Sequence, residues 1–142
     1  MTDTSDSLQS GDRIELKFPA RGDLIVLARL VTSAISARAG FDIEELEDLR
    51  LAVGELCLLT LQGSDARSGD LCLVLTVLDD AIGVASTLER ATAGDGRTEV
   101  EGEDSAQLSE QILGALVDEH GRESKDGQVR AWMRKQRGGH AE

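Results

Sequence analysis

The chain has 142 residues, and its 27 acidic residues outnumber its 15 lysines and arginines to give a formal net charge of −12. This composition excludes nucleic-acid binding by a general phosphate-neutralising surface, because such binding needs a basic face. Stacking on nucleobases is also disfavoured, because the aromatic side chains are only Phe18, Phe41 and Trp132. The acidic surface favours a basic protein partner by electrostatic attraction, although the same charge is equally a means of keeping a protein soluble.

A chain of this length predicts one domain with a single core. We expect a flexible acidic tail over residues 1–12, the folded domain over residues 13–137 and a polar tail over residues 138–142. The sequence contains no signal peptide and no apolar run of membrane-spanning length, which predicts a cytoplasmic protein with no membrane partner. Cys57 and Cys72 lie in apolar runs without metal-ligand spacing, which predicts free core thiols, with a disulfide as the minor alternative.

The first predicted elements are a strand and a helix. Apolar and charged side chains alternate over residues 13–18, which predicts a strand with one buried face that Pro19 ends. Residues 23–39 carry apolar side chains at helical spacing and predict a helix that stops at Gly40.

The helix predicted over residues 42–62 has the strongest signals in the chain. Asp42 and Glu45 have the D-x-x-E spacing of a capping box, and the apolar positions become nearly continuous toward the end of the helix. Glu55 is the one charge in this buried part, and burying an unpaired charge is costly. Glu55 therefore either pairs with an arginine or lies on the helix rim, or it faces a pocket as a general base.

The second half of the chain predicts mainly strands. Residues 71–78 form an apolar run, which predicts a strand buried on both faces, and Asp79 and Asp80 predict a turn into a second strand ending near residue 90. The polar residues 91–104 predict a long surface loop.

A third helix is predicted over residues 105–121, a turn over 125–127 and a last strand over 128–135. The resulting order is strand, helix, helix, strand, strand, loop, helix, strand. This order predicts an α+β fold, a two-layer α/β sandwich in which helices cover a mixed, mostly antiparallel sheet.

The order of elements and the stretch IEELEDLRLAVGELCLLTL resemble the anti-sigma factor branch of the GHKL ATPase superfamily, the RsbW-type switch-protein kinases. The resemblance covers about residues 13–137, and LVDEH followed by VRAWMRK resembles the family's closing helix end and last strand. The positions that match the family's central helix in place are Asp48, Leu51, Ala52, Val53 and Glu55.

The resemblance places the family's general-base glutamate on Glu55 and its Mg²⁺-binding asparagine on Leu59, which has no oxygen to offer the metal. The adenine-reading D-x-G-x-G motif falls on residues 89–93, where Glu89 keeps an acid but alanine replaces both glycines. The phosphate-binding G-x-G at the start of the third helix falls on residues 107–109, again without a glycine.

These changes imply a degenerate nucleotide site, so no cofactor and no metal site are expected, and ATP with Mg²⁺ would bind only if the altered site still functions. The resemblance implies a bacterial regulatory protein that sequesters an alternative sigma factor and is released by an anti-anti-sigma partner. The alternative is an active ATP-dependent serine kinase that phosphorylates its antagonist, with Glu55 as the general base and Glu89 at the adenine. A homodimer is a further alternative, because the family commonly dimerises.

Overall fold

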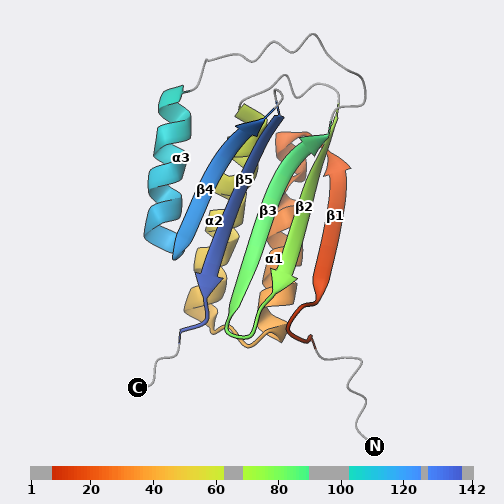
Figure 1. Cartoon of the computed structure of the whole chain (residues 1–142), viewed down its shortest axis with the longest axis vertical. Helices are drawn as coiled ribbons and strands as arrows, with labels where there is room; N and C mark the ends of the chain where they lie inside the picture. The colour runs from red at the N-terminus through yellow and green to blue at the C-terminus, as the bar shows by residue number, and fades with distance from the viewer. Residues whose placement is uncertain (1–7, 63–68, 90–102, 126–127, 139–142) are drawn as a thin grey trace, which may run out of the picture.

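The computed structural model describes residues 8–62, 69–89, 103–125 and 128–138. In this part of the chain three helices pack on one face of a five-stranded sheet (Figure 1), so the predicted two-layer α+β sandwich is confirmed. The strands are β1 (Arg13–Pro19), β2 (Asp70–Val77), β3 (Ala81–Glu89), β4 (Glu119–Lys125) and β5 (Gln128–Gln136). The helices are α1 (Ile25–Arg38), preceded by the 3-10 turn η2 (Gly22–Leu24), α2 (Ile43–Gln62) and α3 (Glu103–Leu116).

The sheet has the strand order β1-β2-β3-β5-β4, and each of these neighbouring pairs is antiparallel. The predicted hairpin is confirmed, because β2 and β3 pair along their whole length on either side of Asp79 and Asp80. The last strand of the chain, β5, lies inside the sheet between β3 and β4. None of the helices in the described part is long and apolar enough to cross a membrane.

The prediction was wrong about β4. The sequence pattern places residues 119–121 in the third helix, but α3 ends at Leu116 and the chain turns directly into a strand. The segment EHGRESK lacks the apolar alternation that marks a half-buried strand. Its only sheet partner is β5, which supplies the buried side chains Ala131 and Met133, so β4 is held as an edge strand by backbone pairing.

One core fills the space between the helices and the inner face of the sheet. Leu71, Leu73 and Leu75 of β2 are fully buried in it, together with apolar side chains of all three helices. The predicted burial of β2 on both faces is not found in the described part, because the alternate residues between these leucines are only half-buried. The helices therefore cover one face of the sheet and leave the other, which we call the outer face, open.

The turns at both ends of the α1–α2 connection are as the sequence predicts. Gly40 has φ +95°, and Phe41 N–H donates to the Ser36 carbonyl in the hydrogen-bond pattern that closes a helix C-terminus. The capping box then starts α2: Glu45 N–H donates to Asp42 Oδ1 at 2.8 Å, and Asp42 N–H donates to Glu45 Oε1 at 2.9 Å. These contacts direct α2 against β3 and β5.

Residues that follow β5 contact two turns at this end of the molecule, the α1–α2 connection and the β2–β3 turn. Arg137 donates to the Ala39 carbonyl at 2.9 Å and to the Asp79 carbonyl at 3.4 Å. Gly138 N–H donates to Oε2 of Glu45, the same carboxylate that completes the capping box. Residues close to the end of the described chain thus hold the start of α2 in place.

Candidate functional site

Glu55 lies in α2 and contacts α3, not an arginine. Ser109 Oγ, which belongs to a side chain only 4% exposed, donates to Glu55 Oε1 at 2.8 Å. Among the described residues no lysine or arginine forms an ion pair with Glu55, so the arginine pairing considered from the sequence is not found there. The half-buried carboxylate is instead bound by a hydroxyl across the interface of two helices.

The position one helical turn after Glu55 is part of the core. Leu59 is 1% exposed and packs with the other buried leucines of α2. An apolar side chain supplies no ligand to Mg²⁺, which requires oxygen atoms. In the described part, moreover, no group of three or more His, Cys, Asp or Glu side chains is placed to hold a metal ion.

The motif expected at the start of α3 lies within the helix. Because α3 begins at Glu103, residues 107–109 fall in its second turn. Only the first turn of a helix has backbone N–H groups free to bind a phosphate, so those of residues 107–109 are engaged inside the helix. The side chain of Ser109, where the resemblance places a glycine, is the group that reaches Glu55.

A second contact holds α3 near α2. Lys135 of β5 donates from Nζ to the Leu116 carbonyl at 2.8 Å, which satisfies one of the free carbonyls at the end of α3. The same Nζ lies 3.6 Å from Asp48 Oδ2 of α2, and the lysine side chain is only 13% exposed. Lys135 of β5 therefore links α3 to α2, where its partner Asp48 is one of the positions that match the family's helix.

Glu89, the candidate adenine contact, lies at the end of β3 on the outer face. Its Oε1 is 3.0 Å from Lys17 Nζ. The hydrogen bond from Lys17 and its positive charge lower the pKa of Glu89, and the same contact raises the pKa of Lys17. The neighbouring Leu88 is the residue that faces the core. The structure thus places Glu55 and Glu89 on opposite sides of the sheet, and residues 91–93 of the motif lie outside the described residues.

The two cysteines are both free thiols, in different surroundings. Cys57 of α2 is buried, and burial raises the pKa of its thiol to about 12. Cys72 of β2 is half-buried on the outer face, where burial and the nearby Glu89 carboxylate raise the pKa of its thiol. The core position predicted for both cysteines is therefore found for Cys57 alone.

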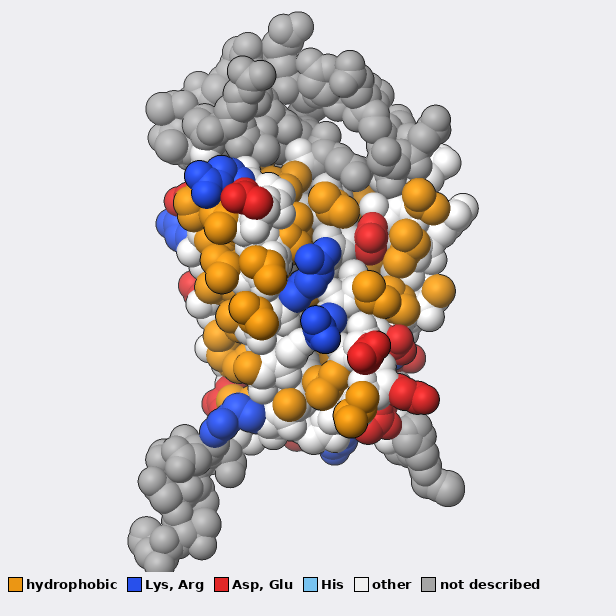
Figure 2. All heavy atoms as spheres, turned by 180° about the vertical axis from the view of Figure 1, so that it is seen from behind, with side chains coloured by type: hydrophobic (Ala, Val, Ile, Leu, Met, Phe, Trp, Pro, Cys, Tyr) orange, Lys and Arg blue, Asp and Glu red, His pale blue; other side chains and the backbone are white. Residues whose placement is uncertain are grey.

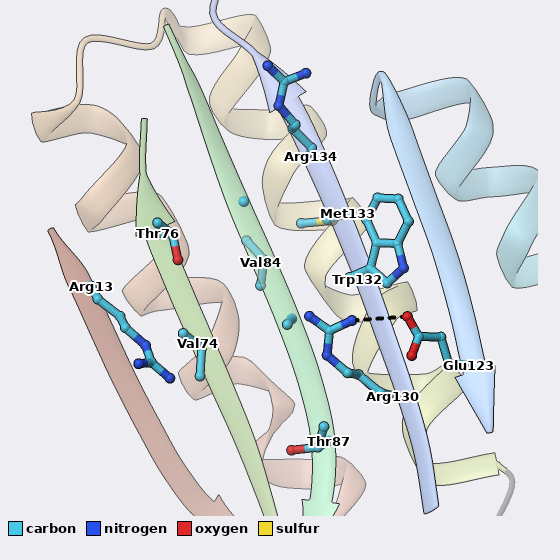
Figure 3. A pocket seen from close by; sticks show the side chains of 12 residues that line it. Arg13, Val74, Thr76, Val84, Thr87, Glu123, Arg130, Trp132, Met133 and Arg134 are labelled. Carbon is cyan, nitrogen blue, oxygen red and sulfur yellow. Dashed lines mark ion pairs between the residues drawn. The ribbon is translucent and has the colours of Figure 1, made fainter. Parts of the chain in front are cut away.

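A depression of about 640 Å³ lies on the outer face, on the side of the sheet away from Glu55 (Figure 3). Arg13, Arg130 and Arg134 line it, and Trp132 and Val74 contribute apolar surface. The sequence did not identify this site. The signal was the alternation of Arg, Trp and Arg along β5, because alternate residues of a strand share one face.

The comparisons with known proteins identify relatives over about half of the chain. No family model matches. The serine-protein kinase RsbW of Bacillus pumilus is 35% identical over 75 residues, which are 50% of this chain and 46% of the relative. The RsbW proteins of Bacillus subtilis and Bacillus velezensis are 31% and 32% identical over 77 residues, in each case 53% of this chain and 48% of the relative.

Over about half of its length this chain is similar to RsbW-type serine-protein kinases. The fold agrees with this relationship, because the described part is the α/β sandwich expected for the GHKL superfamily. The chain spans about half the length of the curated relatives it matches.

Proposed function

We propose that this chain is an anti-sigma-factor-like regulatory protein. It sequesters an alternative sigma factor in the bacterial cytoplasm and is released by an anti-anti-sigma partner, without using nucleotide. The relationship to RsbW-type kinases supports the regulatory role. The main observation in favour of lost nucleotide chemistry is the hydrogen bond from Ser109 to Glu55.

Three features of α2 and α3 support a degenerate nucleotide site. The carboxylate at the general-base position accepts a hydrogen bond from the protein's own hydroxyl. The position for a metal ligand is the buried Leu59, and residues 107–109 use their backbone N–H groups inside a helix. Phosphoryl transfer depends on metal binding and positioning of the phosphates, so Glu55 alone cannot support it.

The helix layer supports a binding role. Figure 2 shows this side of the molecule, where hydrophobic side chains gather over the helices. Val26 and Leu30 of α1 are 47% and 61% exposed, and Leu51 of α2 is 59% exposed. Exposed apolar surface of this kind often marks a protein–protein contact. The net charge of −12 favours a basic client, as a DNA-binding protein would be.

Calorimetric titration with ATP and ADP in the presence of Mg²⁺ tests the nucleotide site. We expect no saturable heat from the wild-type protein at millimolar nucleotide. Leu59→Asn combined with Ser109→Gly supplies a metal ligand and removes the hydroxyl, so this variant is the one expected to gain Mg²⁺-dependent binding. Saturable binding by the wild type that Glu55→Ala abolishes would contradict the proposal.

Pull-down of purified sigma factors from the host tests the partner. At least one alternative sigma factor should bind at micromolar concentration, and an anti-anti-sigma protein should displace it. If no sigma factor binds at that concentration, the regulatory assignment is wrong whatever the nucleotide result.

The alternative function is an active serine kinase. Glu55 is retained at the position that the resemblance assigns to the general base, and Glu89 keeps an acid at the adenine motif. This candidate requires transfer of labelled phosphate from ATP to an antagonist protein, with no transfer by Glu55→Ala.

We also propose the homodimer that the resemblance implies. Phe18 of β1 and Leu71 and Leu73 of β2 are buried under the helices and are not available for such a contact. A dimer would therefore use another surface. Analytical ultracentrifugation should show a dimer, and a monomer at high concentration would exclude it.

A further inference from the structure

The outer face of the sheet has an ordered pattern of side chains that the proposed function does not use. Alternate residues of each strand point to this face, and the strand pairing aligns them in rows across the sheet. Four cations stand at the ends of two such rows. We call them the basic frame; its members are Arg13 and Lys17 on β1 and Arg130 and Arg134 on β5.

The strand register places an apolar row between the two ends of the basic frame. The first row runs across the sheet from Arg13 on β1 through Thr76 on β2 and Gly83 on β3 to Arg134 on β5. The middle row, two residues along each strand, starts at Glu15 on β1 and is apolar from there on, with Val74, Ala85 and Trp132. The third row runs from Lys17 on β1 through Cys72 and Thr87 to Arg130 on β5.

Small side chains on β3 make the middle of this face a groove. The outward residues of β3 are Gly83, Ala85 and Thr87, and the first two are smaller than the residues opposite them on β2 and β5. Trp132 forms one wall (Figure 3). Its indole packs against Gly121 of β4, where a Cβ atom would come within 2.6 Å of the ring. The groove therefore runs along β3, with aromatic surface on one side.

The groove is basic although the protein is acidic. Three arginines and one glutamate are the charged residues that line it, while the whole chain has a net charge of −12. Each cation of the basic frame pairs with a glutamate that is more than half exposed, and such pairs contribute little free energy, so a ligand carboxylate can replace them. The distances are 3.4 Å for Arg13–Glu15, 3.0 Å for Lys17–Glu89, 3.6 Å for Arg130–Glu123 and 4.0 Å for Arg134–Glu119.

The spacing of the basic frame decides which anion fits. Four residues along a strand span about 13 Å, and the three strand intervals from β1 to β5 span about 14 Å. A single phosphate or carboxylate cannot reach cations so far apart. An extended peptide can, because its residues i, i+2 and i+4 point to one side with the same spacing as the three rows.

We propose that this groove binds an acidic peptide segment of a partner protein, extended along β3 with the pattern acidic-x-apolar-x-acidic. The two acidic side chains lie toward the cations of the first and third rows. The apolar side chain between them packs on Val74, Ala85 and Trp132. This site is separate from the sigma-factor surface of the proposed function and does not depend on it.

Trp132 gives a direct measurement, because it is the only tryptophan of the chain and there is no tyrosine. The probe is the capped peptide Ser-Glu-Ser-Leu-Ser-Glu-Ser, titrated at low salt while tryptophan emission is recorded. We expect a saturable change that weakens with added salt. The matched peptides are the same sequence with lysine for glutamate, and the isomer Ser-Glu-Glu-Ser-Leu-Ser-Ser, and both should bind much more weakly.

Charge-reversal variants of the basic frame test whether the peptide binds in this groove. Arg13→Glu combined with Arg134→Glu should raise the peptide's Kd about tenfold or more, whereas Arg50→Glu, an exposed change on α2, should leave it unchanged. If the double variant does not fold, as judged by circular dichroism, Arg13→Gln with Arg134→Gln replaces it.

Four results would overturn the proposal. They are no saturation up to about 2 mM peptide, an equal response to the lysine peptide, a Kd that the frame variants do not change, and the same emission change with sulfate or free glutamate. The last result would mean that a simple anion suffices. Emission that depends on protein concentration without peptide would mean that a second copy of the chain covers this face.

Discussion

The two faces of the sheet are built from alternate residues of the same strands, yet they carry different kinds of side chains. On the inner face of β2 and β3, Leu73 and Val84 are buried, and the polar Ser86 accepts a hydrogen bond at its Oγ from Thr60 Oγ1 at 2.8 Å. On the outer face the same strands present small or half-exposed residues inside a frame of cations. The inner face fixes the fold, and the outer face is free to specify a partner, because changes there disturb no core contact.

Glu55 and Glu89 show the same contrast in two carboxylates. Glu55 is half-buried among helices and is bound by a hydroxyl. Glu89 is exposed on the outer face and is bound by an ammonium group. Loss of the buried hydroxyl that binds Glu55 should be costly, whereas loss of the exposed ammonium group that binds Glu89 should not. Water can take the place of the exposed group but not of the buried one. The following predictions test this contrast between the faces.

The largest difference should come from neighbouring residues of β2. Leu73→Ala opens a cavity in the core and should lower the free energy of unfolding by about 2–5 kcal/mol. Val74→Ala removes a half-buried side chain from the outer face and should lower it by under about 1 kcal/mol. Urea denaturation of both variants measures the difference. Equal losses would show that another molecule covers the outer face.

Ser109→Ala should lower the free energy of unfolding by about 1–2 kcal/mol, because it leaves the half-buried Glu55 carboxylate without its donor. In a chain that already carries Glu55→Ala, the same change should cost clearly less. A double-mutant cycle from chemical denaturation measures this coupling. Zero coupling energy would mean that the hydrogen bond does not form in solution.

Alkaline pH should destabilise the protein through Cys57. Its thiol pKa is raised from an ordinary 9.0 to about 12 in the folded state, so the unfolded chain loses this proton first as the pH rises. The stabilisation is complete below pH 9 and is lost as the pH approaches 12, by up to about 1.4 kcal/mol per pH unit. Unfolding curves of Cys57→Ala should show a shallower dependence on pH, and identical slopes would exclude this cause.

The smallest effect should come from the outer-face ion pairs. Glu123→Gln breaks the contact with Arg130, in which both side chains are about half exposed, and should change the free energy of unfolding by under about 1 kcal/mol. The test is a comparison of urea midpoints at low and high salt. A loss comparable with that of Leu73→Ala would mean that the two faces do not differ as described.

The sequence was sufficient for the elements whose signals are local. The capping box at Asp42 and Glu45, the stop at Gly40 and the turn at Asp79 are specified by residues close in the chain. The sequence did not predict β4, because an edge strand without an apolar face has no periodic signal. This strand is held by its pairing with β5.

The site was predictable only in part. The sequence identified Glu55 as the unusual charge of α2, and the family resemblance identified positions 59 and 109 as altered. It could not show that Ser109 reaches Glu55, because the two residues are 54 positions apart and meet only through the packing of α3 on α2. The groove was missed for the same reason, since Arg13 joins Arg130 and Arg134 only across four strands.

The interior position of β5 has a consequence for how the protein is made. Ribosomes synthesise β5 after the other four described strands, yet it supplies the partner for both β3 and β4, and Arg137 contacts two earlier turns. Until β5 has been synthesised, β3 has an unpaired edge and β4 has no sheet partner among the described strands. Such edges promote aggregation. A chain truncated before β5 should therefore yield an insoluble product.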